Sequence, residues 1–324
     1  MPIHAQNFYF PLEKGLYQVV PGLHALGTAF GNNNADGLIF QFDENFDHYH
    51  QTKLAARTEA LKKYYCKEEL DTHKTSIISR FIIQQLCHES PGLFSYQYQN
   101  NQQSLHCGLT GETLVFDPRY ELSEIQTASI GYVDSLDALA MQVQEDLALV
   151  EKTNDGRDRI IALHLCFPNH WVAKDKIGKS FLASHAPVPG MARINQRADQ
   201  LLNNLLNKGP FVRFAWGLAT DKYLNHHPVA PEDMDKKLWL GRRFDPTDPH
   251  LYLRVERQVI HGFPAIDTIL FTIRTYFYDV SLLKQSPAKR QALQSALQSM
   301  SPETLRYKGL NEDLALILEW LALN

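Results

Sequence analysis

Two long apolar runs near the end of the chain constrain its fold most strongly. Tyr252–Ile260 has the sequence YLRVERQVI and Thr268–Tyr278 has the sequence TILFTIRTYFY, and a turn containing Gly262, Phe263 and Pro264 lies between them. Both runs are rich in β-branched and aromatic residues, which favour extended strands. Strands joined by so short a turn predict an antiparallel hairpin, because parallel strands need a crossover of a dozen or more residues.

Further strand-like and helix-like segments surround this hairpin. Strands are expected at Arg159–Phe167 and Pro210–Leu218, with a hairpin inside residues 93–117, and helices at His48–Cys66, Asp71–Cys87, Ser135–Lys152, Lys174–Ala183, Ile194–Lys208 and, as two helices, from Pro287 onward. Gln144 and Glu145 are expected on the exposed side of the 135–152 helix. Residues 1–45 and 221–250 lack a sustained period and predict an irregular arm and a long loop. Helices at both ends with late strands predict an α+β fold with a mostly antiparallel sheet.

Composition narrows the functional classes. The 324 residues include 32 Lys plus Arg and 36 Asp plus Glu, so the formal net charge is −4. Nucleic acid is therefore not an expected partner, because phosphate neutralisation needs a basic surface. No G-x-G-x-x-G or G-x-x-x-x-G-K loop occurs, no stretch approaches eighteen apolar residues, and the N-terminus has no signal-peptide pattern. We expect a cytoplasmic protein that does not span a membrane.

Imidazole is the ligand type that the composition favours. The chain has 14 histidines and 4 cysteines, and the cysteines form no C-x-x-C pair, so they are expected to be buried free thiols: Cys66, Cys87, Cys107 and Cys166. His185 precedes a stiff Pro-x-Pro segment at 187–189 that would fix the direction of its ring. His164 lies within a predicted strand. Each of these two histidines, taken alone, is also explained as an ordinary core or surface group.

Charged side chains of the predicted hairpin form a second candidate cluster. Strand alternation places Arg254, Glu256 and Gln258 on one face of their strand. In the same way, Arg274 lies on one of the two faces of the neighbouring strand. If those faces coincide, two guanidinium groups meet a carboxylate, in either a structural ion-pair network or a ligand site. In a ligand site, Arg254 or Arg274 would take a carboxylate and Glu256 an ammonium group.

Five segments, taken in order, resemble one known family. They are VQEDLALV (143–150), HLCFPNHWVAKDKIGKSFLASHAPVPG (164–190), GPFVRFAWG (209–217), LRVERQVIHGFP (253–264) and ILFTIRTY (269–276). Together they are similar to the haem-dependent oxidative N-demethylase alpha-subunit-like family over about residues 8–283, within a single domain of residues 1–324 whose residues 284–324 form a C-terminal helical tail. The resemblance implies a PAS-like haem-binding fold and a monooxygenase-type demethylation of a small secondary amine. It also implies electrons that pass from NAD(P)H through FMN and a [2Fe–2S] cluster.

The resemblance gives the histidines their expected role, and the chemistry of the other side chains gives theirs. A histidine-ligated haem b is implied, with His185 as the iron ligand and His164 as the alternative. The other candidates for holding the cofactor are Lys176, Lys179, Arg213, Arg254 and Arg274, and Glu256 is the candidate catalytic residue. The chain has no cysteine pattern for an iron–sulfur cluster and no flavin motif, so a partner reductase would supply the electrons. Two alternatives stay open: a non-catalytic PAS-like sensor of haem or another small ligand, and a member that has lost haem.

Overall fold

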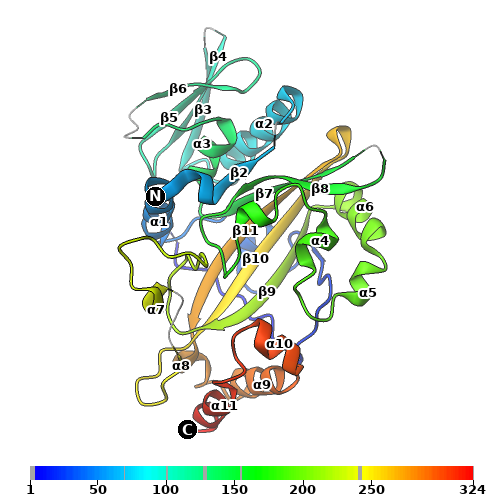
Figure 1. The fold of residues 1–324 in the computed structure, drawn as a ribbon. Helices are drawn as coiled ribbons and strands as arrows, with labels where there is room; N and C mark the ends of the chain where they lie inside the picture. The colour runs from blue at the N-terminus through cyan, green and yellow to red at the C-terminus, as the bar shows by residue number, and fades with distance from the viewer. Residues whose placement is uncertain are drawn as a thin grey trace.

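Two antiparallel sheets organise the molecule (Figure 1). The computed structural model describes residues 4–68, 70–99, 101–126, 130–153, 155–239 and 243–323. The larger sheet has the strand order β1-β9-β10-β11-β7-β8-β2, and the smaller one has the order β3-β4-β5-β6. Within these ranges the protein is a mixed α+β fold, as the sequence predicts.

The elements have the following bounds. The larger sheet contains β1 (His24–Ala25), β2 (Tyr65–Lys67), β7 (Asp146–Lys152), β8 (Asp158–His164), β9 (Phe211–Ala219), β10 (Tyr252–Phe263) and β11 (Thr268–Asp279). The smaller sheet contains β3 (Phe94–Gln99), β4 (Gln102–Cys107), β5 (Thr113–Phe116) and β6 (Leu122–Gln126). The helices are α1 (Phe46–Tyr64), α2 (Thr72–Glu89), α3 (Ser135–Met141), α4 (Phe181–His185), α5 (Ala192–Asn195), α6 (Ala198–Lys208), α7 (Lys236–Trp239), α8 (Val280–Leu283), α9 (Pro287–Gln298), α10 (Pro302–Tyr307) and α11 (Leu314–Ala322).

The predicted late hairpin is confirmed and forms the centre of the larger sheet. β10 and β11 pair antiparallel along their whole length, and β9 pairs with the other edge of β10. The helices predicted at His48–Cys66 and Asp71–Cys87 are confirmed as α1 and α2. The C-terminal tail contains α9, α10 and α11, one helix more than predicted.

The prediction of one helix over Ser135–Lys152 is wrong. α3 ends at Met141, and Asp146–Lys152 is the strand β7, which lies between β11 and β8. Its apolar run Leu147–Val150 is buried on both faces of the sheet, and such a run cannot be told from a buried helix by periodicity alone. Gln144 and Glu145, expected to be exposed, have 0 % exposure because they precede an internal strand.

Three smaller expectations also need correction. The helix predicted at Lys174–Ala183 is a 3-10 turn at Ala173–Asp175 followed by the separate helix α4. The strand predicted to end at Phe167 ends at His164. Four free cysteines occur among the described residues, but only Cys107 and Cys166 are buried, while Cys66 and Cys87 are half-buried.

The larger sheet has two unlike faces. Side chains directly opposite each other in an antiparallel pair share a face, so the register assigns each residue to one side. We call one side the buried face, whose members in the middle of β10 and β11 are all buried: Val255, Arg257, Val259, Thr272, Arg274 and Tyr276. The other side, which we call the open face, has mostly half-buried members: Arg213, Ala215, Gly217, Arg254, Glu256, Gln258, Phe271, Ile273, Thr275 and Phe277.

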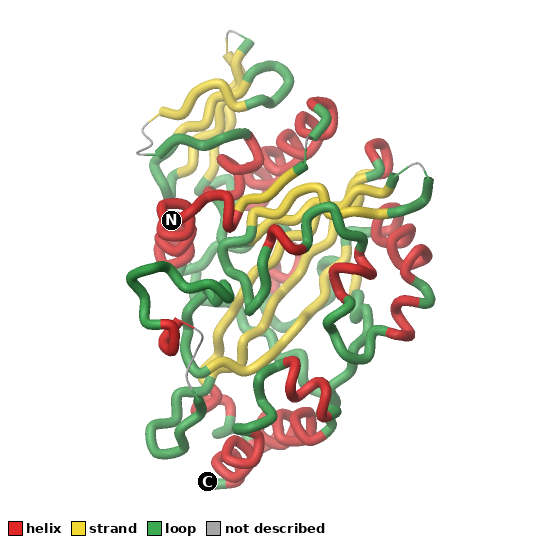
Figure 2. The backbone as a smooth tube through the Cα atoms, in the orientation of Figure 1, coloured by secondary structure: helices red, strands yellow, loops and turns green. Residues whose placement is uncertain are grey.

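Different segments cover the two faces. Tyr9 and Leu12 of the N-terminal arm pack on the buried face with Val255 and Tyr276. At one end of the open face α6 packs so closely that a Cβ on Gly262 would lie 2.0 Å from the Leu206 carbonyl oxygen. Helices α4 to α6 lie along one side of the sheet, and α10 lies near the end of β9 (Figures 1 and 2).

Helix length and polarity bear on membrane association. Among the described residues, every helix is too short or too polar to cross a bilayer.

Candidate functional site

A polar cluster lies in the middle of the open face. Arg254 Nη1 forms an ion pair with Glu256 Oε1, and Gln258 Nε2 donates a hydrogen bond of 3.1 Å to Glu256 Oε2. Arg254 Nη2 also donates to the Phe167 carbonyl oxygen at 3.1 Å and to Thr275 Oγ1 at 3.3 Å. Strand alternation thus brings together the three residues that the sequence predicted on one face.

Glu256 is held as a carboxylate in this cluster. Burial opposes its ionisation, but the Arg254 charge and the hydrogen bonds from Arg254 and Gln258 hold the pKa of Glu256 below its usual range. Each carboxylate oxygen already accepts one hydrogen bond and has capacity for a second. Glu256 can therefore accept a further N–H donor without giving up its present partners.

Two further cations approach the same face. Arg213, opposite Gln258 on β9, has a buried Nε atom with no hydrogen-bond partner. Lys308 follows α10, and its Nζ donates to the Trp216 carbonyl oxygen at 2.6 Å. Burial lowers the pKa of Lys308 to about 8 although the Glu256 carboxylate acts in the opposite direction. Within the described ranges no carboxylate forms an ion pair with either cation, so both have unused donor capacity.

His185 lies at the border of the open face, at the end of α4. Its Nδ1 is 2.8 Å from the Phe181 carbonyl oxygen, an acceptor, so Nδ1 carries the proton and Nε2 has the free lone pair. Burial lowers the pKa of His185, with the Arg213 charge acting in the same direction, so the ring is neutral near pH 7. A neutral imidazole whose other nitrogen donates to a carbonyl has the usual arrangement of a metal-ligating histidine.

The two candidate lysines differ in their surroundings. Lys176 Nζ donates to the Ser184 carbonyl oxygen, next to His185, and so ties the preceding loop to α4. Lys179 is exposed, and its backbone carbonyl accepts a hydrogen bond from Ile160 of β8 at 2.9 Å. Lys176 thus lies beside the candidate iron ligand, whereas the Lys179 side chain points to solvent.

Arg274 does not join Arg254 and Glu256. Arg274 is opposite Arg257 in the hairpin register, and Glu256 is opposite Thr275, so the two faces considered in the sequence do not coincide. Arg274 is fully buried on the other side, where its Nη2 forms an ion pair of 2.6 Å with Asp43 Oδ2 and its guanidinium lies 3.8 Å from the Tyr49 ring centre. The structure gives it a carboxylate partner of its own.

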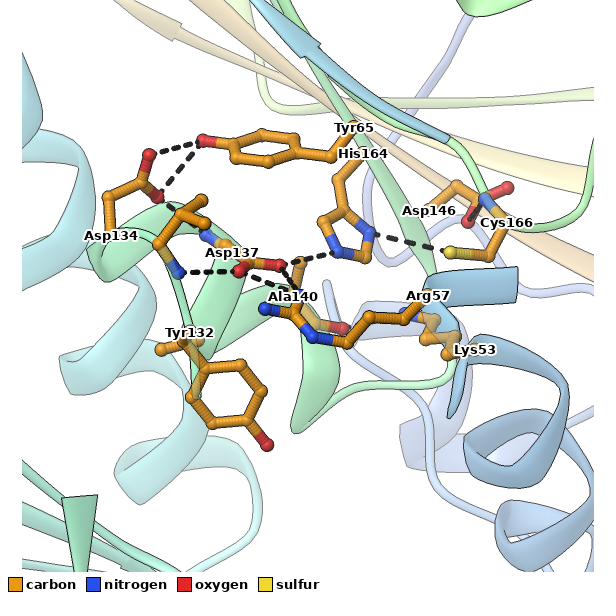
Figure 3. A network of polar contacts seen from close by, with 12 residues as sticks. Lys53, Arg57, Tyr65, Tyr132, Asp134, Asp137, Ala140, Asp146, His164 and Cys166 are labelled. Atoms are coloured by element: carbon orange, nitrogen blue, oxygen red, sulfur yellow. Dashed lines mark hydrogen bonds and ion pairs between the residues drawn. The ribbon is translucent and has the colours of Figure 1, made fainter. Parts of the chain in front are cut away.

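His164 is also separate from the open face and belongs to a buried polar network (Figure 3). Its Nε2 lies 3.3 Å from Asp137 Oδ1, and its Nδ1 lies 3.8 Å from Cys166 Sγ. Arg57 pairs with the same Asp137 at 2.6 Å. Both ring nitrogens of His164 therefore already have protein partners, and the side chain is 1 % exposed.

Asp146, His164 and Cys166 are close enough to bind a metal, with one donor atom of each within 4.8 Å of the others. However, both Asp146 oxygens accept backbone N–H groups, from Cys166 at 2.8 Å and Phe167 at 2.9 Å. Burial raises the pKa of the Cys166 thiol, and the Lys53 ammonium, which donates to three carbonyl oxygens, supplies a buried positive charge nearby. These contacts favour a structural role for the group, because a cation would compete with Lys53.

The buried network also supports the open face. Asp146 holds the Phe167 amide, and the Phe167 carbonyl in turn accepts from Arg254, the partner of Glu256. Sequence reasoning missed Asp146 and Lys308. The four-residue apolar run after Asp146 is a signal for an internal strand, whereas nothing in the local sequence indicates that Lys308 reaches the sheet.

A comparison with known protein families gives one extensive match. Residues 33–316 match the family model described as haem-dependent oxidative N-demethylase, alpha subunit-like. The matched range includes all the candidate residues discussed above and most of the chain.

Proposed function

The chain belongs to the haem-dependent oxidative N-demethylase alpha-subunit-like family, and from this premise we propose that it is a haem-dependent oxidoreductase that removes an N-methyl group from a small secondary amine. The observation that carries the proposal is the state of His185. It is a neutral imidazole with Nδ1 bonded to the Phe181 carbonyl and Nε2 left for a ligand, beside a sheet face that is only half covered.

The residues of the open face fit a haem group. His185 would hold the iron through Nε2, and Arg213, whose Nε lacks a partner, would donate to a carboxylate of the porphyrin. The small side chains Ala215 and Gly217 leave the central part of β9 without bulky groups. His164 and Arg274 are poorer candidates for these roles, because each already has polar partners on the other side of the sheet.

Glu256 is the proposed substrate-binding residue. Its carboxylate keeps acceptor capacity beside Arg254 and Gln258, and an amine N–H is the donor it would take. Arg254 fixes the carboxylate in position, since it is itself held by the Phe167 carbonyl and Thr275. The chain's contribution is thus to orient the amine with its N-methyl group toward the cofactor.

Haem iron, when bound, supplies the activation of O₂. The overall reaction consumes the amine, O₂, two electrons and two protons, and yields the demethylated amine, formaldehyde and water. The electrons would come from NAD(P)H through FMN and a [2Fe–2S] cluster on another subunit. The alpha-subunit-like family description is consistent with such a partner. A PAS-like arrangement of sheet and ligand belongs to the same proposal.

Absorption spectroscopy of the purified full chain, with and without added haemin, tests the cofactor. We expect a Soret band that shifts on reduction. Absence of the band after haemin addition under reducing conditions would overturn the proposal.

Substitution of Glu256 separates catalysis from cofactor binding. With dimethylamine, NAD(P)H and a reductase fraction, we expect the wild type to release formaldehyde. Glu256→Gln should retain the Soret band and lose at least tenfold in kcat/KM, because a neutral amide holds the amine more weakly than a carboxylate. Glu151→Gln is a matched control, since Glu151 pairs with Lys74 and Arg159 elsewhere in the sheet. Haem binding without turnover by the wild type would favour the sensor alternative.

A further inference from the structure

The open face has more positive than negative charge. Arg254 and Glu256 compensate each other as an ion pair, but Arg213 and Lys308 face the same surface and form no ion pair within the part of the chain that the structure describes. Glu256 is the carboxylate within electrostatic range of both cations. The surface therefore has two positive charges that a dianion would neutralise.

Lys308 is held in position by contacts that leave it able to bind an anion. One of the three N–H groups of its Nζ donates to the Trp216 carbonyl oxygen, and the other two N–H groups remain available as donors. The ammonium lies 5.1 Å from the centre of the Tyr17 ring and 5.8 Å from that of Trp216, and these two rings pack edge to face at 5.7 Å. A Cβ on Gly217, an open-face residue, would lie 3.9 Å from Nζ, so Lys308 approaches the open face directly.

The segment that carries Lys308 is fixed to the body of the protein. The Tyr17 amide of the N-terminal arm donates to Ser299 Oγ at 2.8 Å, just before α10, and Leu305 and Leu310 pack into the core beneath the sheet. Ser301 caps α10 by accepting from the Thr304 amide at 3.2 Å. These contacts fix the C-terminal tail, and the tail in turn holds the Lys308 ammonium at the open face.

We propose that Arg213 and Lys308 form an anion-binding pair that receives the two carboxylate groups of the haem, so that the C-terminal tail completes the cofactor site. This inference rests on the proposed function. It adds Lys308, which lies outside the five quoted segments but within residues 33–316 of the family match. It also explains how Glu256 can take an amine: the two carboxylates offset the charges of Arg213 and Lys308 and leave Glu256 with Arg254 alone.

Binding of haemin and of haemin dimethyl ester to the full chain tests the pair. The ester retains the iron and the ring but has no propionate charge. We expect the wild type to bind haemin about tenfold to 100-fold more tightly than the ester, as for charge-assisted hydrogen bonds lost with both carboxylates. Lys308→Met should weaken haemin binding about tenfold and leave ester binding unchanged, so the preference for haemin shrinks. Arg213→Met should do the same, and Lys308→Arg should restore most of the preference.

Lys284→Met is the matched control. Lys284 also donates to backbone carbonyls, those of Trp320 and Leu323, and lies over the Trp320 ring at 4.3 Å, but it is in the tail away from the open face. Its variant should keep the full preference for haemin. Thermal unfolding of every apo variant establishes that it folds.

Three results would overturn the inference. In the first, the wild type binds haemin and the ester with equal affinity, and in the second, Lys308→Met weakens the binding of both ligands by the same factor. Each of these two results would refute the anion-binding pair and leave the proposed function intact. Failure of the wild type to bind either ligand would instead refute the proposed function, and the inference with it.

Discussion

The two faces of the larger sheet give arginine two different roles. On the buried face Arg274 has Asp43 as a partner and the Tyr49 ring against its guanidinium, and it is completely enclosed. On the open face Arg213 forms no ion pair among the described residues, and this is the contrast, because the buried Nε lacks a hydrogen-bond partner in both arginines. Both arginines lie on antiparallel strands of the same sheet. The difference between them therefore follows from the face on which each side chain lies. A guanidinium paired inside a closed core stabilises the fold, whereas an unpaired one on a half-covered surface is available to a ligand.

Removal of the two arginines tests this comparison most directly. Arg274→Met leaves Asp43 buried without its partner, and we expect the free energy of unfolding to fall by about 3–5 kcal/mol. Arg213→Met removes a charge that has no carboxylate partner, so the change should lie within about 0.5 kcal/mol. Urea unfolding of the apo proteins, followed by circular dichroism, measures both values. Similar losses in the two variants would contradict the assignment of the faces.

The histidines extend the comparison from stability to cofactor binding. His185→Ala removes the proposed iron ligand, so we expect haem affinity to fall roughly 100-fold or more, since even outer-shell partners are worth about 10–100-fold. His164→Ala should keep the Soret band at its wild-type position and lower stability, because it empties a buried site and leaves Asp137 with one fewer partner. Haemin titration at the Soret maximum measures the affinity. A band lost in His164→Ala and kept in His185→Ala would reverse the assignment of the ligand.

The sequence predicts the cluster on the open face better than it predicts the position of Arg274. Alternation along Arg254–Gln258 places three site residues together correctly, because a strand has a fixed period of two. The relation of Arg274 to them depends on the hairpin register. A shift of one residue in that register moves the side chain to the other face, and the local sequence does not fix it. Lys308 and the Asp43 partner of Arg274 come from distant segments, and only tertiary packing brings them to the sheet.

The stiff segment after His185 predicts a fixed ring, and the structure fixes that ring by a different contact. The His185 ring is fixed by the hydrogen bond that its Nδ1 donates to the Phe181 carbonyl oxygen, one helical turn earlier, and not by the prolines that follow. The misassigned 135–152 segment shows the opposite limit. The spacing of its apolar residues fits a helix. However, a strand that is buried on both faces of a sheet, as β7 is, has the same run of apolar residues.

Asp146 links the buried network to the open face and should give stability a specific pH dependence. Burial raises its pKa to about 7, above the value of about 3.9 in an unfolded chain. The folded state therefore binds more protons between these values, and the contribution of Asp146 to the free energy of unfolding falls as pH rises, by about 1.4 kcal/mol per pH unit, and is constant above pH 7. The difference in unfolding free energy between wild type and Asp146→Asn, measured by urea at pH 5, 6, 7 and 8, isolates this contribution. Asp248→Asn, at an exposed position, is the control.

A difference that is flat from pH 5 to pH 7 would contradict the enclosure of Asp146, and a difference that increases with pH would show that Lys53 and the two amides outweigh burial.

The smallest expected effect concerns the shape of the open face itself. Gly217 and Gly262 both lie on this side, but a Cβ at Gly217 meets only the end of a lysine side chain at 3.9 Å, whereas at Gly262 it meets the backbone of α6. Gly217→Ala should therefore change the free energy of unfolding by no more than about 0.5 kcal/mol, since ordinary van der Waals contact replaces open space. Urea unfolding measures the change, with Gly262→Ala, which cannot fit without moving α6, as the contrasting control. A loss of more than about 2 kcal/mol in Gly217→Ala would mean that the middle of the face is as tightly packed as its α6 end, which would leave no room there for a porphyrin.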